Sequence, residues 1–457
     1  MSIPILAPNS TWFRPSNTSI TRSSITEINI VNSYIPTGSE TASWDASAAN
    51  DGSVMCYVNG TKLTIAGNGS GKIFANADSS FAFSDFNRTD YFKNVTAINN
   101  AELFDTTNAT TFHRLFEICE KLTTVNVSNW NTENVTDMSR MFISAEKLTA
   151  VDVSNWKTGN VTSIANMFQL CLSLEELDVS KWDTSACENM RSTFTACLSL
   201  ETLDLSNWDV SNVNTMAQMF LSTTSYGNMT ITSIGDVSGW DTGNVENMQG
   251  MFQYCSSLEE LDLSNWNVGK VTIMQSMFTG CSSLTSIGDT GSWNTSLCEN
   301  MAGMFNGCTS LETLDLSGFD TSKVTTMQDM FANCSKLEEI TLGEKFAWVG
   351  TNGYLPAQTD SNIPDADGFW YTQHREKYLP ADIQSQTAMT YYASLTIVNN
   401  IDFLVKNGSL LNIADELRVL SGTENAMGLN TMATYVGEAN NEIDAQTELI
   451  AQIANVL

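Results

Sequence analysis

The sequence is poor in positive charge and in histidine. Its 457 residues carry 21 lysines and arginines against 51 aspartates and glutamates, and the formal net charge is −30. A negative field of this size repels phosphate backbones and anionic lipid, so we expect neither nucleic acid nor a membrane surface as a partner. The two histidines, His113 and His374, lie far apart, and no nucleophile elbow, phosphate-binding loop or HExxH motif is present. We therefore expect no catalysis, no metal and no cofactor.

Long apolar runs are also missing. No uninterrupted run approaches the length needed to span a bilayer, so we expect no membrane insertion. The first 17 residues lack the basic segment followed by an apolar segment that a signal peptide requires. Ten cysteines in a long chain without such a signal predict reduced thiols.

What the chain has in abundance is an internal repeat. Marker phenylalanines recur every 26 residues, with longer gaps of 32 residues after the fifth and 27 residues after the seventh. These markers are Phe116, Phe142, Phe168, Phe194, Phe220, Phe252, Phe278, Phe305 and Phe331. Chance does not maintain such a register over nine units, so the repeats are expected to stack as consecutive coils.

Two patterns within each unit predict its local structure. In "LEELDLS" (258–264), Leu261 and Leu263 alternate with polar residues, which is typical of a strand with one buried face. Met138, Met141 and Phe142 recur at offsets of three and four, which predicts a short helical turn. The expected fold class is an α/β repeat, a leucine-rich-repeat solenoid with one parallel strand per coil.

Composition divides the chain into further parts. The predicted organisation is an N-terminal arm (1–19), a β-rich N-terminal cap domain (20–100), a solenoid of about nine 26-residue coils (101–346), a C-terminal capping module (347–394) and a helical attachment or oligomerisation segment (395–457). Asn59-Gly60 between two apolar alternating runs predicts a β-hairpin inside the cap domain.

Sulfur recurs in register with the markers. A cysteine lies three residues after the marker in seven of the nine units, and a methionine directly before it in seven. Thiolate and thioether ligands suit soft metals, so a metal or redox role is one interpretation. Ala145 and Thr223 replace the cysteine in two units, as at a packing position, and we therefore expect these sulfur atoms to fill a core. The recurring tryptophan is expected to be structural for a similar reason, because Phe319 replaces it once.

An acidic strip is the main candidate binding surface. Four residues before the recurring aromatic stand Asp152, Asp178, Asp204, Asp236, Asp262, Asp289 and Asp315. Stacking at about 4.8 Å sets like charges side by side, at a cost of about 0.9 kcal/mol per neighbouring pair in water. Two interpretations stay open: the aspartates form capped, solvated turns, or they recognise a basic or polyhydroxyl partner.

The C-terminal segment shows a heptad pattern. The predicted oligomerisation residues are Leu429, Met432, Val436, Ile443, Ile450, Ile453 and Leu457. Isoleucine at both core positions favours three or more strands, so the pattern predicts a coiled coil and a homo-oligomer, with a trimer favoured. The alternative is a single amphipathic helix that folds back on the capping module.

Two resemblances bear on function. The repeat, with "LDLSNWDVSNVNTMAQMF" and "GCSSL", resembles the BspA-like leucine-rich-repeat surface proteins of bacteria over residues 40–394. That resemblance implies extracellular adhesion without catalysis. The segment "LLNIADELRVLSGTENAMGLNTMATYV" (410–436) resembles short helical modules of bacteriophage tail and appendage proteins.

Together these features predict a non-enzymatic bacteriophage virion structural protein, a fibre or appendage made in the host cytoplasm. Its expected partners are a protein or glycan on a cell surface and other virion proteins. The alternative is a cellular BspA-like adhesin on the bacterial surface that binds host proteins.

Overall fold

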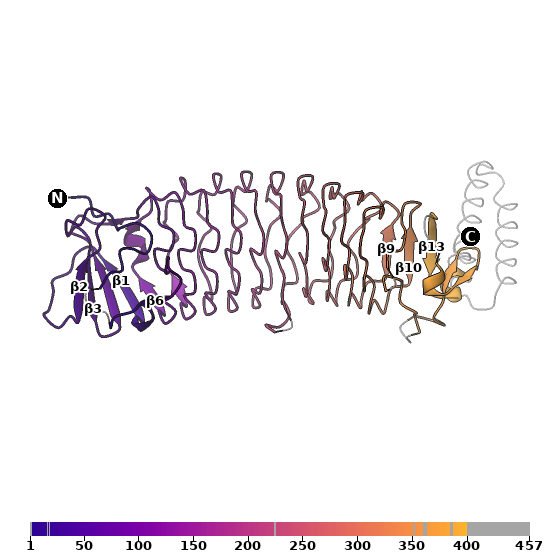
Figure 1. The fold of residues 1–457 in the computed structure, drawn as a ribbon, viewed down its shortest axis with the longest axis horizontal. Helices are drawn as coiled ribbons and strands as arrows, with labels where there is room; N and C mark the ends of the chain where they lie inside the picture. Colours follow the sequence, from indigo (N-terminus) through magenta and orange to yellow (C-terminus); the bar gives the residue numbers. More distant parts are fainter. Residues whose placement is uncertain are drawn as a thin grey trace, which may run out of the picture. The chain divides into compact units, whose positions relative to one another are not determined.

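The structure is a computed structural model that describes residues 2–399, apart from residues 16, 18, 224, 351, 360–362 and 384–386 (Figure 1). It divides into two compact units. The first comprises Met1–Pro356 with Gln384–Met389, and the second comprises Ala357–Ile383 with Thr390–Leu457.

The first unit begins with a mixed six-stranded sheet in the order β2-β3-β4-β1-β6-β8 (Figure 1). Its strands are β1 (Glu27–Val31), β2 (Ala42–Asp45), β3 (Met55–Asn59), β4 (Lys62–Ala66), β6 (Ala97–Asn99) and β8 (Thr124–Val125). β5 (Ile73–Phe74) pairs in parallel with β7 (Phe104–Asp105), and two short 3-10 helices, η1 (Arg22–Ser24) and η2 (Ala101–Leu103), complete the region. The antiparallel pairing of β3 with β4 around Gly60 confirms the predicted hairpin.

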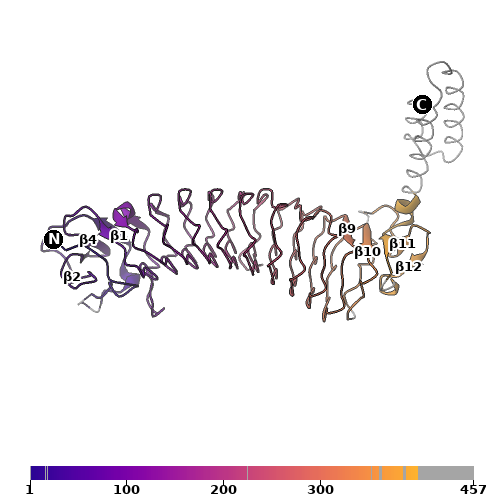
Figure 2. The ribbon, with the colours of Figure 1, turned by 90° about the horizontal axis from the view of Figure 1, so that it is seen from above.

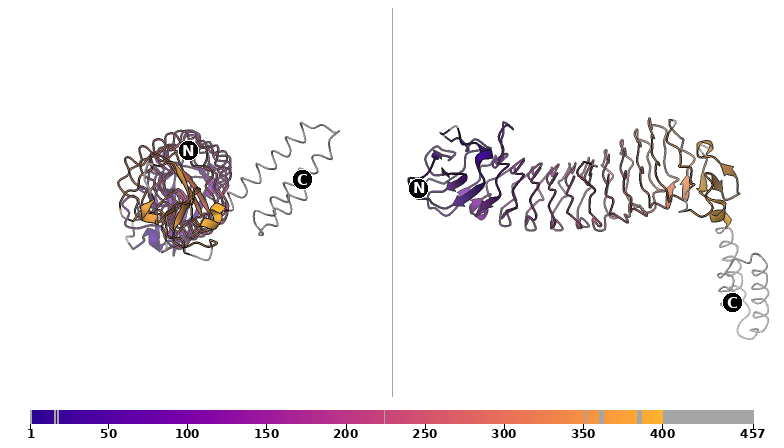
Figure 3. Two further views of the ribbon diagram at one scale, coloured as in Figure 1. Left: turned by 90° about the vertical axis from the view of Figure 1, so that its right-hand side faces the viewer. Right: turned by 90° about the horizontal axis from the view of Figure 1, so that it is seen from below.

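Beyond this sheet the chain runs through successive coils, each lying beside the next (Figure 2). Parallel bridges join residues of adjacent coils: Asp78 to Thr111, Thr111 to Asp137, Asp137 to Ser163, and so on through Asn300 to Thr326. The same succession is visible from below in Figure 3. Because Asp78 already takes part, the stack begins upstream of residue 101, where the repeats were predicted to start.

The short helix predicted in each repeat does not form. Between residues 104 and 346, with residue 224 outside the description, the structure contains no helix. Instead, the residue two before each marker phenylalanine has a positive φ, and so does the residue two after it in all but one unit. These residues are Arg114, Ile118, Arg140, Ser144, Asn166, Leu170, Ser192, Ala196, Gln218, Gly250, Tyr254, Ser276, Gly280, Gly303, Gly307, Asp329 and Asn333. Left-handed residues at this spacing interrupt any right-handed helix.

Hydrogen bonds between coils explain why turns replace the helix. The amides of Arg140, Phe142 and Ser144 donate to carbonyls of the next coil over 2.8–2.9 Å. The amides between them, such as that of Ile143, close turns onto the carbonyl three residues earlier. A left-handed non-glycine residue costs about 1–2 kcal/mol, which the bonds to the neighbouring coil offset.

Regular strands are also scarcer than predicted. Only a few repeats carry a strand, as in β9 (Thr313–Leu316), which pairs in parallel with β10 (Glu339–Leu342). Other repeats are joined at this face by a single bridge, such as Glu260 with Ser286. The predicted α/β leucine-rich-repeat solenoid is therefore wrong: the described residues form mixed β-sheets, isolated bridges and turns.

Columns of identical side chains fill the interior of the coils. The marker rings stack at centroid distances of 5.3–6.0 Å, with Phe83 stacked on Phe116 before the first of them. The recurring tryptophans of the repeat are buried too, and each of their indole N–H groups donates to a carbonyl of the preceding coil, as Trp182 Nε1 does to Val153 over 3.1 Å. The prediction that sulfur and aromatic side chains form a core is confirmed by their burial.

The second unit contains a few short strands that pair antiparallel. β11 (Trp370–Thr372) pairs with β12 (Lys377–Tyr378) and with β13 (Met389–Tyr392), and η3 (Pro380–Asp382) is a 3-10 helix. A short α-helical segment occupies 395–399.

The predicted coiled coil of residues 429–457 lies outside the described residues, and none of the described elements is a coiled-coil helix. Among residues 2–399 that the structure describes, no helix combines the length and the hydropathy of a membrane-spanning segment.

Candidate functional site

The acidic strip consists of Asp152, Asp178, Asp204, Asp236, Asp262, Asp289 and Asp315. Six of the seven are exposed and Asp315 is half-buried. Each carboxylate accepts a hydrogen bond from the backbone amide two residues later, over 2.8–3.1 Å. In four coils the serine at that later position also donates its hydroxyl to the same oxygen, as Ser180 does to Asp178 over 2.7 Å. The aspartates thus cap tight turns, as one of the two interpretations predicted.

In three of the coils these local bonds favour the charged form of the strip aspartate. The Ser180 hydroxyl, followed by the Ser180 amide, lowers the pKa of Asp178 below its ordinary value. Hydroxyl and amide donors of the following serine likewise lower the pKa of Asp236 and of Asp262. None of the seven aspartates forms a salt bridge with a described residue. The strip therefore presents negative charge that is not ion-paired in the part of the chain described, although the nearby charge of Lys181 helps to lower the pKa of Asp178.

Two coils of the stack carry one extra residue on this face. Gly235 and Gly288 stand directly before a strip aspartate and have φ values of +78° and +76°. A Cβ at Gly235 would lie 2.6 Å from Ser206 Oγ and 2.8 Å from Asp204 Oδ1, so a larger residue does not fit. Such one-residue bulges bend a strand locally and often lie beside functional sites.

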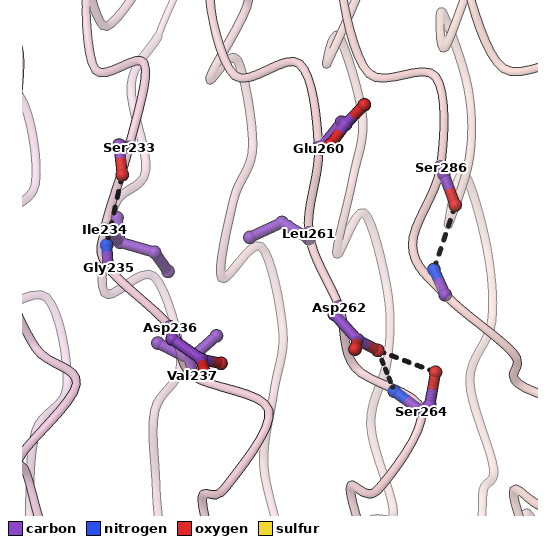
Figure 4. Close-up of a pocket in the computed structure, with 11 residues that line it drawn as sticks. Ser233, Ile234, Gly235, Asp236, Val237, Glu260, Leu261, Asp262, Ser264 and Ser286 are labelled. Carbon is purple, nitrogen blue, oxygen red and sulfur yellow. Dashed lines mark hydrogen bonds between the residues drawn. The ribbon is translucent and has the colours of Figure 1, made fainter.

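A groove of about 520 Å³ lies between these two bulges (Figure 4). Three adjacent coils line it, with residues 233–237, the run Glu260–Leu261–Asp262 with Ser264, and Ser286 with Gly288. Glu260 and Asp262 are two residues apart in the middle coil, with Leu261 between them, and therefore lie on the same face. Both residues border the groove (Figure 4). Two of the seven strip aspartates, Asp236 and Asp262, therefore contribute to one concave site.

A second depression, of about 370 Å³, lies between two earlier coils and has different charges. Lys157, Lys181 and Asp183 line it together with residues 154–156 and 158–159. Because it carries two lysines, it is not part of the uncompensated acidic surface.

The buried cysteines have raised pKa values, in contrast to the lowered pKa values of Asp178, Asp236 and Asp262. All ten are buried, and burial raises the pKa of Cys281 to about 12. Its thiol donates to the carbonyl of Phe252 over 3.0 Å, and six other column cysteines make the equivalent bond one coil back. These thiols are packing donors that remain protonated at neutral pH. Within the described residues, no three histidine, cysteine or acidic side chains are grouped so as to hold a metal ion.

A buried charged cluster occurs near the start of the stack. Arg114 donates to His113 Nε2 over 3.0 Å and pairs with Glu117 over 2.5 Å. Glu117 is buried, and its second carboxylate oxygen has no hydrogen-bond partner among the described residues. Burial lowers the pKa of His113, whose other ring nitrogen contacts Ser139 Oγ at 2.7 Å. His113 is thus integrated in a polar network of the chain itself.

Sequence reasoning located the strip but missed the groove. The seven aspartates cap turns at equivalent positions of successive coils, and their role in binding stays a prediction. The predicted oligomerisation residues Leu429, Met432, Val436, Ile443, Ile450, Ile453 and Leu457 lie outside the described residues. Glu260 and the two bulge glycines were not singled out. The 27-residue gap between Phe278 and Phe305, one residue longer than the standard unit, was the available signal for the second bulge.

The repeats match a known protein family. A family described as "Mycoplasma protein of unknown function, DUF285" matches the chain three times, at residues 86–177, 152–234 and 226–344. No curated protein shows significant similarity to the chain. The three matches together span residues 86–344, which is more than half of the sequence, and the chain therefore belongs to the DUF285 family.

Proposed function

We propose that the chain is a non-catalytic virion protein of a bacteriophage that uses its acidic strip to adhere to a cell surface. The observation that carries the proposal is the series of strip aspartates, six of them exposed, each fixed by a local turn and none in a salt bridge with a described cation. Charges held in place in this way need little reordering when a partner binds, which favours recognition.

The construction of the coils supports a display role. Backbone, indole, threonine and thiol donors all connect neighbouring coils, as Thr184 Oγ1 does to the Asp209 carbonyl over 2.8 Å. The strip is consequently mounted on a cross-connected scaffold. A negatively charged surface also accelerates encounter with a positively charged partner, and this effect weakens as salt is added.

The virion setting derives from the segment 410–436, which resembles helical modules of phage appendage proteins. A cellular BspA-like adhesin is the second candidate, favoured by the "LDLSNWDVSNVNTMAQMF" and "GCSSL" motifs of the repeats. Mass spectrometry of purified phage particles separates the two. Recovery of the chain in particles is expected, and its recovery only in a protease-accessible fraction of whole cells would establish the second candidate instead.

The role of the strip is tested on the full-length chain by flow cytometry with fluorescently labelled protein and intact bacteria. The variant Asp178→Asn/Asp204→Asn/Asp262→Asn removes three strip charges and is expected to weaken cell binding several-fold. The matched control Glu133→Gln/Glu188→Gln/Glu246→Gln removes three exposed charges outside the strip and should leave binding nearly unchanged. Equal binding by the strip variant and the parent chain would refute the strip as the adhesive surface.

A further inference from the structure

We propose that the groove between the Gly235 and Gly288 bulges binds a lysine or arginine side chain of an extended basic polypeptide. This inference deepens the proposed function, on which it rests, because it assigns the partner class and the point of contact within the acidic strip.

The shape of the groove comes from the two inserted glycines. At each bulge the strip aspartate turns its backbone amide onto the serine of the preceding coil: Asp236 N–H donates to Ser206 Oγ, and Asp289 N–H to Ser264 Oγ, each over 2.8 Å. The bulge amides themselves are bonded within their own coil, as Gly235 N–H is to Ser233 Oγ over 3.2 Å. The two bulges that border the groove are therefore held by hydrogen bonds of their backbone amides, and a regular coil lies between them.

The charge of the groove favours a cation. Asp236 and Asp262 each use Oδ1 for their turn, and Oδ2 of each accepts no hydrogen bond from the described residues. The Glu260 carboxylate forms no salt bridge in the described part of the chain, and its backbone takes part in the bridge to Ser286. Donors from Ser264 keep the pKa of Asp262 low, while the neighbouring charge of Asp236 acts in the opposite direction. A cation between these carboxylates relieves that repulsion and completes their coordination.

The floor of the groove suits the stem of a long basic side chain. Ile234, Val237 and Leu261 contribute apolar side chains to the lining of the groove, and their exposed fractions are 2%, 2% and 6%. Lysine and arginine place their methylene groups against apolar surface while the charged head reaches polar groups. A polyhydroxyl ligand would leave the three uncompensated negative charges unneutralised, so charge complementarity selects the basic polypeptide.

The test uses the full-length chain and a fluorescein-labelled peptide of alternating lysine and serine, followed by fluorescence anisotropy. Asp236→Asn/Glu260→Gln removes two groove charges and leaves the three aspartates of the strip variant intact. We expect its affinity for the peptide to fall about fivefold. The matched control Asp152→Asn/Glu176→Gln removes one aspartate and one glutamate from coils without an inserted glycine, and we expect less than a twofold change.

Three outcomes decide the inference. An equal loss in the groove variant and the matched control would mean that the peptide senses only the general field of the strip, and would overturn it. Undiminished binding of a peptide in which every lysine is acetylated would overturn it as well. Deletion of Gly288 retains every carboxylate but restores the standard repeat length. If this variant is folded, as judged by circular dichroism, and binds the peptide with unchanged affinity, the shape of the groove does not matter and the inference is refuted. If the strip variant fails to bind cells while the groove variant behaves like its control, only the inference fails and the proposed function stands.

Discussion

The stacked phenylalanine column provides the sharpest test of how the coils are held together. Phe278 is fully buried, and its ring centroid lies 5.7 Å from that of Phe252 and 5.6 Å from that of Phe305. Truncation of a buried phenylalanine to alanine costs about 3–5 kcal/mol. Phe278→Leu keeps most of the volume and loses two aromatic contacts of about 0.5–1.5 kcal/mol each, so its cost should be about 1–3 kcal/mol. The expected order of unfolding free energy is parent, then leucine variant, then alanine variant.

The assay is urea unfolding followed by tryptophan fluorescence, combined with hydrogen exchange read by mass spectrometry. Because each coil packs only against its neighbours, the loss of protection in Phe278→Ala should be concentrated in residues 250–306 and spare the coil at 138–145. Phe86→Ala is the control, since that side chain is 58% exposed and should change stability by less than about 0.5 kcal/mol. If Phe278→Ala unfolded at the same urea concentration as Phe86→Ala, the ring column would not be a source of stability.

Three further predictions follow from the thiols, the bulges and the strip. Because burial raises the pKa of Cys281 to about 12, and all ten cysteines are buried, the folded chain should resist iodoacetamide at pH 8 and react fully in urea; rapid alkylation of the folded chain, measured by mass spectrometry, would contradict the buried column. Gly288→Ala places a Cβ 2.5 Å from Ser264 Oγ at a φ of +76° and should cost about 1–3 kcal/mol, whereas Gly239→Ala, with no atom within 4 Å, should cost under about 1 kcal/mol; similar urea midpoints for both would exclude strain at the bulge. Ser180→Ala removes the hydroxyl that donates to Asp178 and should therefore raise the pKa of Asp178. In the parent chain Asp178 keeps its charge to a lower pH, and the stability that this charge gives the turn is lost only as the pH falls through the lowered pKa. An NMR titration that gives the same Asp178 pKa in both proteins would refute the hydrogen bond.

The interior of the coils was predictable from the sequence because its rule is simple. Side chains that recur at one position in consecutive repeats must meet in a stack, so the register of Phe142 and Phe168 already implied ring contacts. Replacement of the column cysteine by Ala145 indicated a dry packing site, and burial of the thiols agrees with this. The exposed aspartates followed from the same register.

The local conformation could not be predicted by the same means. Offsets of three and four at Met138, Met141 and Phe142 fit a helix, but they fit consecutive turns equally well when alternate amides bond to the next coil. Only the position of the neighbouring coil decides between the two. The groove required this knowledge too, because Gly235 and Gly288 acquire their meaning from atoms of the preceding coil.

The ladder of bonds between coils has an evolutionary consequence. Each 26-residue unit makes the same donors and acceptors available to the unit before it and the unit after it, so one whole unit can be duplicated or lost without creating a new interface. Gene-level gain or loss of units would lengthen or shorten the acidic surface in fixed steps, while a single inserted glycine changes its contour at one step alone. The length of the acidic surface and the shape of its groove can therefore change independently among proteins built from this repeat.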